Sequence, residues 1–264
     1  MASQPPANTL PIFYGDLEPL SSTIHPDHKF RSSDKAPHLV GVHALPITID
    51  EFVSVQRFCP IIFSVGETSI PLVLMGLNEG VNVFIDEEGK LNGDFYVPAY
   101  VRRYPFLLAR LAPDAQELSL CFDPTSDQVG KFEDGLPLFE DGKPSEATNN
   151  ALKFCEEFEL SAQRTVQFMA ELGQAGLLME GEVSIQPSGA EQPFVYRGFQ
   201  MVNEEKLRDM RGDELRKMNQ NGMLALIFAH LFSMQLMREV FARQVQQGKG
   251  PPMPQGFQAP AAGF

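Results

Sequence analysis

Short apolar runs separated by turn residues dominate the first half of the chain. Between Leu39 and Asp86 the runs are LVGVHAL, PIIFSV, IPLVLMGL and VNVFID, and a further run, ELSLCFD, begins at Glu117. Runs of this length bounded by Gly, Pro, Asp and Glu are typical of strands. The pattern predicts a strand in each run and a short helix at 50–58, between the first two.

A helical period appears in the second half. Ser145 is suited to an N-cap, and apolar residues recur every three or four positions up to Gly173, at Leu152, Cys155, Phe158, Ala162, Val166, Met169 and Leu172. Two further strands, at 182–186 and 194–202, could pair as a hairpin. After Asn203 the pattern is helical, with interruptions near Gly212 and Gly222, and ends at about Gln247.

Two proline-rich stretches modify this pattern. Pro98 is suited to the first turn of a helix that Pro105 should end or kink. The stretch at 124–144 is rich in Asp, Glu, Gly and Pro, which predicts an exposed loop with a turn at 140–142. The elements together predict an α+β protein with mostly antiparallel strands early and amphipathic helices late. We expect an extended arm at 1–40, a single α+β domain at 41–247 and a flexible tail at 248–264.

Composition and charge limit the expected partners and the expected cellular compartment. The chain has 264 residues and a formal net charge of −13, which repels a phosphate backbone, so nucleic acid is not expected as a partner. The three cysteines form no CxxC pair, and the N-terminus has no apolar signal region. We therefore expect a cytoplasmic protein. We also expect no cofactor.

The most apolar stretch, Met223–Met237, is shorter than the roughly 20 residues that a membrane span needs. It predicts a core helix and no membrane span. The same helix could also pair with another chain, so a homo-oligomer is left open.

Several segments together resemble one bacterial family. They are LPIFYGDLEPL, FVSVQRFCPIIF, MGLNEGVNVFIDEEGKLNGDFYVPAYVRRYPF, LCFD, GLPLFEDGKP, YRGFQMVNEEKL and ALIFAHLFSM. In these segments the chain is similar to the SapC family from about Leu10 to Val240. One departure is Val81, where the family more often has Glu.

The resemblance implies a Gram-negative bacterial setting and an association with a surface-layer locus. Family members are often found near outer-membrane receptor systems and flavin-dependent tryptophan halogenases, which implies an accessory role in uptake or modification. Some members carry a peptidase label. A surface-layer or envelope component is therefore one alternative function.

A hydrolase is the other alternative, and two N-terminal motifs could serve it. Ser32 and Lys35 form a bare SxxK, which would place the two side chains on one face of a helix, although a solvated loop explains the same residues. His25, Asp27 and His28 could hold zinc or ferrous iron, although His-Pro-Asp-His is also a natural turn.

Arginines among aromatic residues are the main candidate binding feature. Guanidinium groups stack on rings and bind carboxylates, so an anionic ligand or an acidic terminus would suit this cluster, and internal salt bridges are the competing explanation. The candidate residues are Tyr96, Tyr100, Arg102, Arg103, Tyr104 and Phe106. His230, within an apolar run, is either a site residue or a neutral core histidine.

The leading hypothesis is a non-enzymatic accessory or binding protein. It would engage a peptide or protein partner near residues 96–106.

Overall fold

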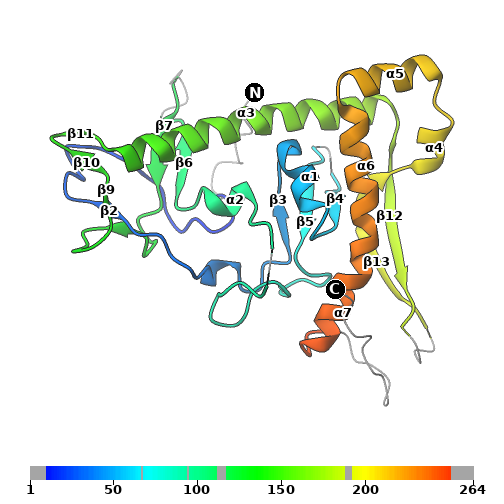
Figure 1. Cartoon of the computed structure of the whole chain (residues 1–264), viewed down its shortest axis with the longest axis horizontal. Coiled ribbons are helices and arrows are strands. Elements are labelled where there is room, and N and C mark those ends of the chain that lie inside the picture. Colours follow the sequence, from blue (N-terminus) through cyan, green and yellow to red (C-terminus); the bar gives the residue numbers. More distant parts are fainter. Residues whose placement is uncertain (1–9, 67, 94, 112–116, 188–191, 251–264) are drawn as a thin grey trace. The chain divides into compact units, whose positions relative to one another are not determined.

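The chain folds into two compact units, each made from two segments. The computed structural model describes residues 10–66, 68–93, 95–111, 117–187 and 192–250. Unit 1 holds Met1–Ala36 and Ala99–Gln163, and unit 2 holds Pro37–Pro98 and Arg164–Phe264. The α+β class is confirmed (Figure 1). The predicted boundaries at 40 and 247 stay a prediction, and residues 251–264 of the predicted tail lie outside the described residues.

Unit 1 contains small antiparallel sheets and the beginning of the longest helix. The sheet orders are β1-β7-β6, β8-β2-β9 and β10-β11. The elements are β1 (Glu18–Pro19), β2 (Lys29–Phe30), α2 (Ala99–Arg102), β6 (Phe106–Ala109), β7 (Ser119–Phe122), β8 (Val129–Gly130), β9 (Leu136–Pro137), β10 (Phe139–Glu140) and β11 (Lys143–Pro144). Their core contains Phe106, Phe122, Val129, Leu138 and Cys155. The predicted strand in ELSLCFD is thus confirmed as β7, and the helix that begins after Pro98 ends before Pro105 as predicted.

The loop predicted at 124–144 is more ordered than its composition suggests. It contains β8 to β11, because Val129 and Leu138 are buried in the core of unit 1 and anchor the polar residues around them. The predicted turn is confirmed: Asp141 and Gly142, with φ of 50° and 74°, connect β10 to β11.

Unit 2 is built on a five-stranded antiparallel sheet in the order β12-β13-β4-β5-β3. The strands are β3 (Ala44–Pro46), β4 (Ile61–Phe63), β5 (Pro71–Leu74), β12 (Leu178–Ile185) and β13 (Phe194–Val202). The predicted helix at 50–58 is found as η2 (Ile49–Glu51) and α1 (Phe52–Val55). The predicted hairpin is confirmed as β12 and β13.

Two strand predictions were wrong or too long. VNVFID, at 81–86, forms no named strand, although its residues 82–85 are buried. The buried Asn82 side chain donates to the carbonyls of Leu39 and Val42 and accepts from Phe84 N–H, which holds this backbone in a loop. In LVGVHAL only the end is strand, because η1 (Pro37–Leu39) occupies its start.

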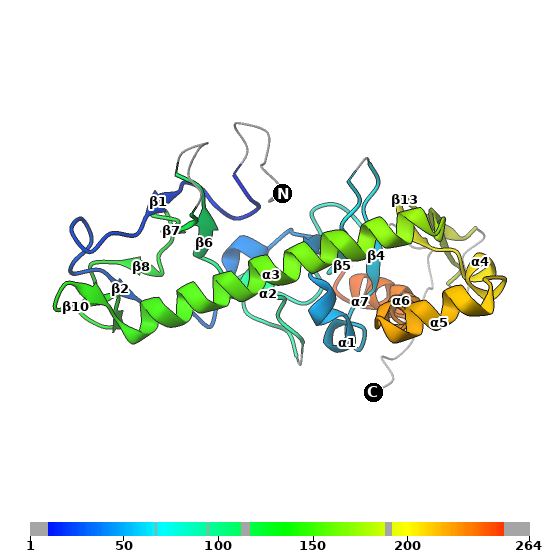
Figure 2. The same cartoon turned by 90° about the horizontal axis from the view of Figure 1, so that it is seen from above.

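Helix α3 (Glu146–Gln174) begins in unit 1 and ends in unit 2, and it is one continuous helix in Figure 1 and Figure 2. Ser145 Oγ accepts from Thr148 N–H, which confirms the predicted N-cap. The predicted apolar face was wrong at Val166, which is exposed, whereas Thr165 is buried.

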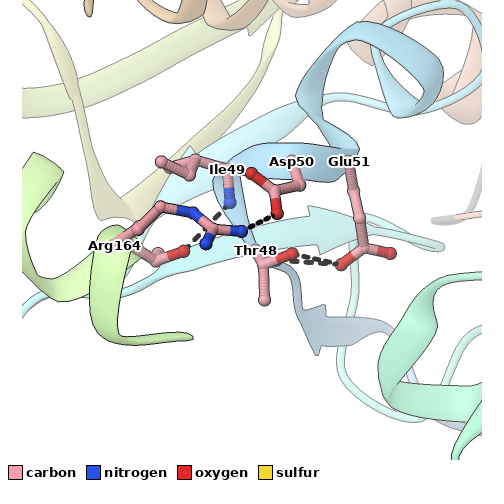
Figure 3. Close-up of polar contacts among 6 residues, drawn as sticks. Thr48, Ile49, Asp50, Glu51 and Arg164 are labelled. Atoms are coloured by element: carbon pink, nitrogen blue, oxygen red, sulfur yellow. Dashed lines mark hydrogen bonds and ion pairs between the residues drawn. The ribbon is translucent and has the colours of Figure 1, made fainter. Parts of the chain in front are cut away.

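Hydroxyl and charged groups of α3 bind η2 within unit 2. Thr165 Oγ1 accepts from Ile49 N–H at 3.0 Å. Arg164 pairs with Asp50 (Figure 3). The buried Glu51 carboxylate accepts from the N–H and hydroxyl of Thr48 in the same view. Thr165 is therefore buried because it satisfies a backbone donor, which an apolar pattern does not reveal.

The C-terminal helices agree with the predicted interruptions. They are α4 (Glu204–Arg208), α5 (Gly212–Gln220), α6 (Met223–Ser233), η3 (Met234–Leu236) and α7 (Met237–Gln246). The helical segment Met223–Gln246 is long and apolar enough to cross a membrane, and 44% of its most apolar window is buried. Buried helices of soluble proteins also meet this criterion, and the absence of a membrane span stays a prediction.

Candidate functional site

The segment from Tyr96 to Phe106, predicted as one binding surface, is divided between the two units. Tyr96 lies in unit 2, where its hydroxyl donates to Glu51 Oε1 at 3.3 Å. The residues of this segment from Ala99 to Phe106 lie in unit 1. A single groove formed by the whole segment therefore stays a prediction.

Arg103 is a buried cation between aromatic rings in unit 1. Its guanidinium carbon lies 4.5 Å from the ring centroid of Tyr100 and 4.3 Å from that of Phe158, and the residue is 8% exposed. Its Nη1 lies 3.7 Å from Glu159 Oε1, which is longer than a hydrogen bond. Burial raises the pKa of Glu159, and the Arg103 charge opposes that rise. Arg103 thus has an internal carboxylate partner, as expected if internal salt bridges explain the arginines.

The other members of the predicted cluster have different surroundings. Arg102 is exposed, and its guanidinium carbon lies 5.3 Å from the ring centroid of Phe154. Tyr104 is half-buried and donates to Asp123 Oδ2 at 3.4 Å, while Phe106 is buried in the core of unit 1. The two adjacent arginines therefore differ: one lies at the surface and the other in an internal stack.

Asp123 fastens residues 11–16, which we call the strap, to the rest of unit 1. Its carboxylate accepts from the N–H of Gly15 at 2.8 Å and of Asp16 at 3.4 Å, and from the N–H and hydroxyl of Thr125 at 2.8 Å and 2.6 Å. Tyr14 adds a hydroxyl bond to the Phe106 carbonyl at 2.9 Å. The Tyr100 hydroxyl also donates to the Ile12 carbonyl at 3.3 Å, so one buried carboxylate and two tyrosine hydroxyls hold the strap.

Two pKa values reflect this arrangement. Burial alone would raise the pKa of Asp123, but the hydrogen bonds from Thr125, Gly15 and Asp16 hold it below its usual value. Burial raises the pKa of Tyr14. Sequence reasoning missed Asp123 as an anchor because its bonds to the strap join residues 107 and 108 positions apart.

His230 is fully buried in unit 2, with both ring nitrogens bonded. Nδ1 lies 2.7 Å from the Ile61 carbonyl, and Nε2 accepts from Val202 N–H at 3.1 Å. These bonds require a neutral ring with its proton on Nδ1. Burial lowers the pKa of His230 to about 4, and the bond to Ile61 partly opposes the shift. His230 joins α6 to β4 and β13, the core role that the sequence left open.

The N-terminal histidines lie together in unit 1. His25 Nδ1 accepts from Ser21 N–H at 3.1 Å, and Nε2 lies 3.0 Å from Glu18 Oε1, so both nitrogens are bonded. The rings of His25 and His28 have centroids 4.7 Å apart, and Asp27 is exposed. Within the described part of the chain, no group of three or more His, Cys, Asp or Glu side chains could hold a metal ion. The metal site stays a prediction.

The SxxK motif is not helical. Ser32 and Lys35 are exposed, and Ser33 Oγ accepts from Lys35 N–H, which is a local turn contact. The motif therefore lacks the helix that would align Ser32 with Lys35.

The edge of the sheet in unit 2 is a site that sequence reasoning missed. In the sheet order, β12 has β13 on one side, and no described strand lies on the other. Glu180, Glu182 and Ser184 are exposed, whereas Val183 and Ile185 pack with the apolar core of unit 2. The outer end of the hairpin lies away from α4 and α5 (Figure 1). The edge was missed because the order of strands depends on pairing between distant segments, such as Gln200 with Phe63.

The comparison with protein families agrees with the resemblance. The SapC family model matches residues 20–240. The chain belongs to the SapC family. No curated protein and no solved structure matches it.

The part of the chain that matches the SapC family includes most of both units. Arg103, Asp123, His230 and all of β12 lie inside the matched range, and the strap precedes it.

Proposed function

We propose that the chain is a non-enzymatic accessory protein that binds an extended segment of a protein partner along the open edge of β12. The observation that carries the proposal is the length of this edge. β12 has eight residues, and its outer side faces no other described strand. Exposed edge strands of this kind offer a row of backbone N–H and C=O groups to an added strand.

The side chains of β12 support strand addition. Val183 is half-buried against the core of unit 2, and Met179 is 42% exposed. An added strand would cover this apolar margin while each new backbone hydrogen bond contributes a net of about 0.5–1.5 kcal/mol. Apolar burial and backbone pairing would therefore act together.

The same edge also has features that protect sheets from aggregation. The register of β12 with β13 shifts between Gly181 and Val183, where two steps along β12 face three along β13, and two glutamates are exposed on β12. Bulges and charges of this kind discourage pairing with a wrong strand. They are compatible with pairing that depends on the partner's sequence.

Hydrogen exchange with a designed peptide tests the proposal. The probe is a fluorescein-labelled, eight-residue peptide of alternating Thr and Val, used below its self-association concentration. We expect saturable binding by fluorescence anisotropy and slower amide exchange within 178–185. The matched control is the same peptide with N-methylated backbone at alternate residues, which cannot complete the ladder. Equal binding of the control, or protection confined to other segments, would contradict the proposal.

We also propose that the protein acts in the cytoplasm, because its three cysteines are all free and buried, as is usual in a reducing compartment. Fractionation of cells that express the untagged chain tests this. Recovery with the envelope would instead support the surface-layer alternative.

A further inference from the structure

Two carboxylates follow one face of β12 at its open edge. Glu180 and Glu182 are both exposed and lie two residues apart, so they project from the same side of the strand. Glu182 pairs with Arg197 on β13, with Nη2 at 2.6 Å from Oε2. Glu180 has no ion-pair partner within the described residues. This face of the edge therefore carries at least one carboxylate that no internal cation neutralises.

The opposite face of β12 is apolar. Ile185 is buried in the core of unit 2, and Val183 packs against the same cluster. Gly181 lies beneath the Phe199 ring, where an added Cβ would be 2.1 Å from a ring carbon. The two faces of the edge therefore differ in chemistry, residue by residue.

We propose that β12 selects a partner segment in which basic and apolar residues alternate. This inference rests on the proposed function. In an added strand, alternate side chains would lie beside the carboxylates on one face and beside Val183 on the other. Opposite charges next to each other across a strand pair stabilise it, and like charges destabilise it. The net charge of −13 would also attract a basic segment before it docks.

A second copy of the chain fits the edge less well. Pairing β12 with β12 about a two-fold axis would bring four carboxylates, Glu180 and Glu182 from each copy, onto one face. The four negatively charged carboxylates would repel one another. A basic extended segment is therefore the occupant that the charges favour.

The experiment compares three peptides with one backbone and different charge. The probes are eight-residue peptides in which Val alternates with Lys, Thr or Glu, and binding is measured by anisotropy and by hydrogen exchange of 178–185. We expect the Lys peptide to bind the natural chain about tenfold more tightly than the Glu peptide, with the Thr peptide between them.

A charge-reversed chain provides the decisive comparison. In the variant Glu180→Lys, Glu182→Lys the order of Lys and Glu peptides should invert. The matched control is Glu156→Lys, Glu157→Lys, which makes the same change in net charge at exposed positions of α3 in unit 1 and should keep the original order. Circular dichroism and exchange of the free proteins establish that each variant is folded.

The outcomes separate the inference from the proposed function. Protection of β12 by all three peptides with equal affinity, or an unchanged order in the charge-reversed variant, overturns the charge selection and leaves strand addition in place. Inversion in both variants would assign the effect to net charge and overturn selection by β12. Failure of every peptide to protect β12 overturns both.

Discussion

At the scale of single residues, burial decides which titratable groups can change charge. His230 is fully enclosed and holds β4 and β13 through its two nitrogens. A proton added to Nε2 would oppose the Val202 N–H and leave a charge without solvent. The neutral ring is therefore part of the fold of unit 2.

His230 should make the protein less stable in acid. Its pKa falls from 6.5 to about 4 in the folded state, so the unfolded chain binds this proton first. The stability that the neutral ring contributes is fully present above about pH 6.5 and is lost as pH falls toward 4. Below that pH the total loss is about 3 kcal/mol. Urea unfolding at a series of pH values from 7.5 to about 4.5 should show the decline.

The comparison is with His230→Gln, which cannot titrate. Its free energy of unfolding should be lower at pH 7 and should fall less between pH 6.5 and 5 than that of the natural chain. Equal slopes in the two proteins would show that other groups, among them the partly buried His28, account for the acid sensitivity.

At the scale of elements, the strap depends on one carboxylate. In Asp123→Asn the amide keeps one acceptor oxygen and places an NH₂ group against donors, so we expect a loss of about 1–3 kcal/mol. The amides of Gly15 and Asp16 should exchange faster with solvent, measured by hydrogen-exchange mass spectrometry. Asp127→Asn is the control, because Asp127 is exposed. Unchanged exchange in the strap of Asp123→Asn would show that the tyrosine hydroxyl bonds of Tyr14 and Tyr100 hold it without the carboxylate.

Elements were predictable where a local pattern determines them. The helical period and the Ser145 cap were sufficient to predict α3. Two strand patterns on either side of a polar stretch were sufficient to predict the hairpin of β12 and β13. The predictions failed where polar atoms make contacts between residues far apart in the sequence. The loop at 81–86 depends on Asn82, and the burial of Thr165 depends on Ile49, neither of which has a periodic signal.

The candidate site was predictable to a lesser degree for the same reason. The sequence shows two adjacent arginines among aromatic residues, but only the fold shows that Arg103 lies inside the stack and Arg102 at the surface. β12 is identified as an edge strand only from the pairing of β13 with β4, because the sequence of a strand does not determine which of its sides has a neighbour.

At the scale of the whole molecule, α3 links two units that each have their own core. Cys155 belongs to the core of unit 1, and Leu172 is fully buried in the other part of the helix. The chain also passes between the units after Ala36 and after Pro98. Unfolding of one unit would fray α3 and so weaken the other, because helix formation is cooperative.

Breaking α3 at the boundary should uncouple the units. Gln163 is exposed, so Gln163→Pro removes no core contact, but it deletes one helical N–H donor and forces its ring against the preceding turn, at a cost of about 3 kcal/mol or more. Scanning calorimetry should show one transition for the natural chain and for the control Gln163→Ala, and two for the proline variant. A single transition in the proline variant would mean that the units are coupled by something other than the continuity of α3. Two transitions in the natural chain would mean that the helix does not couple them, and cooperativity then ends within each unit.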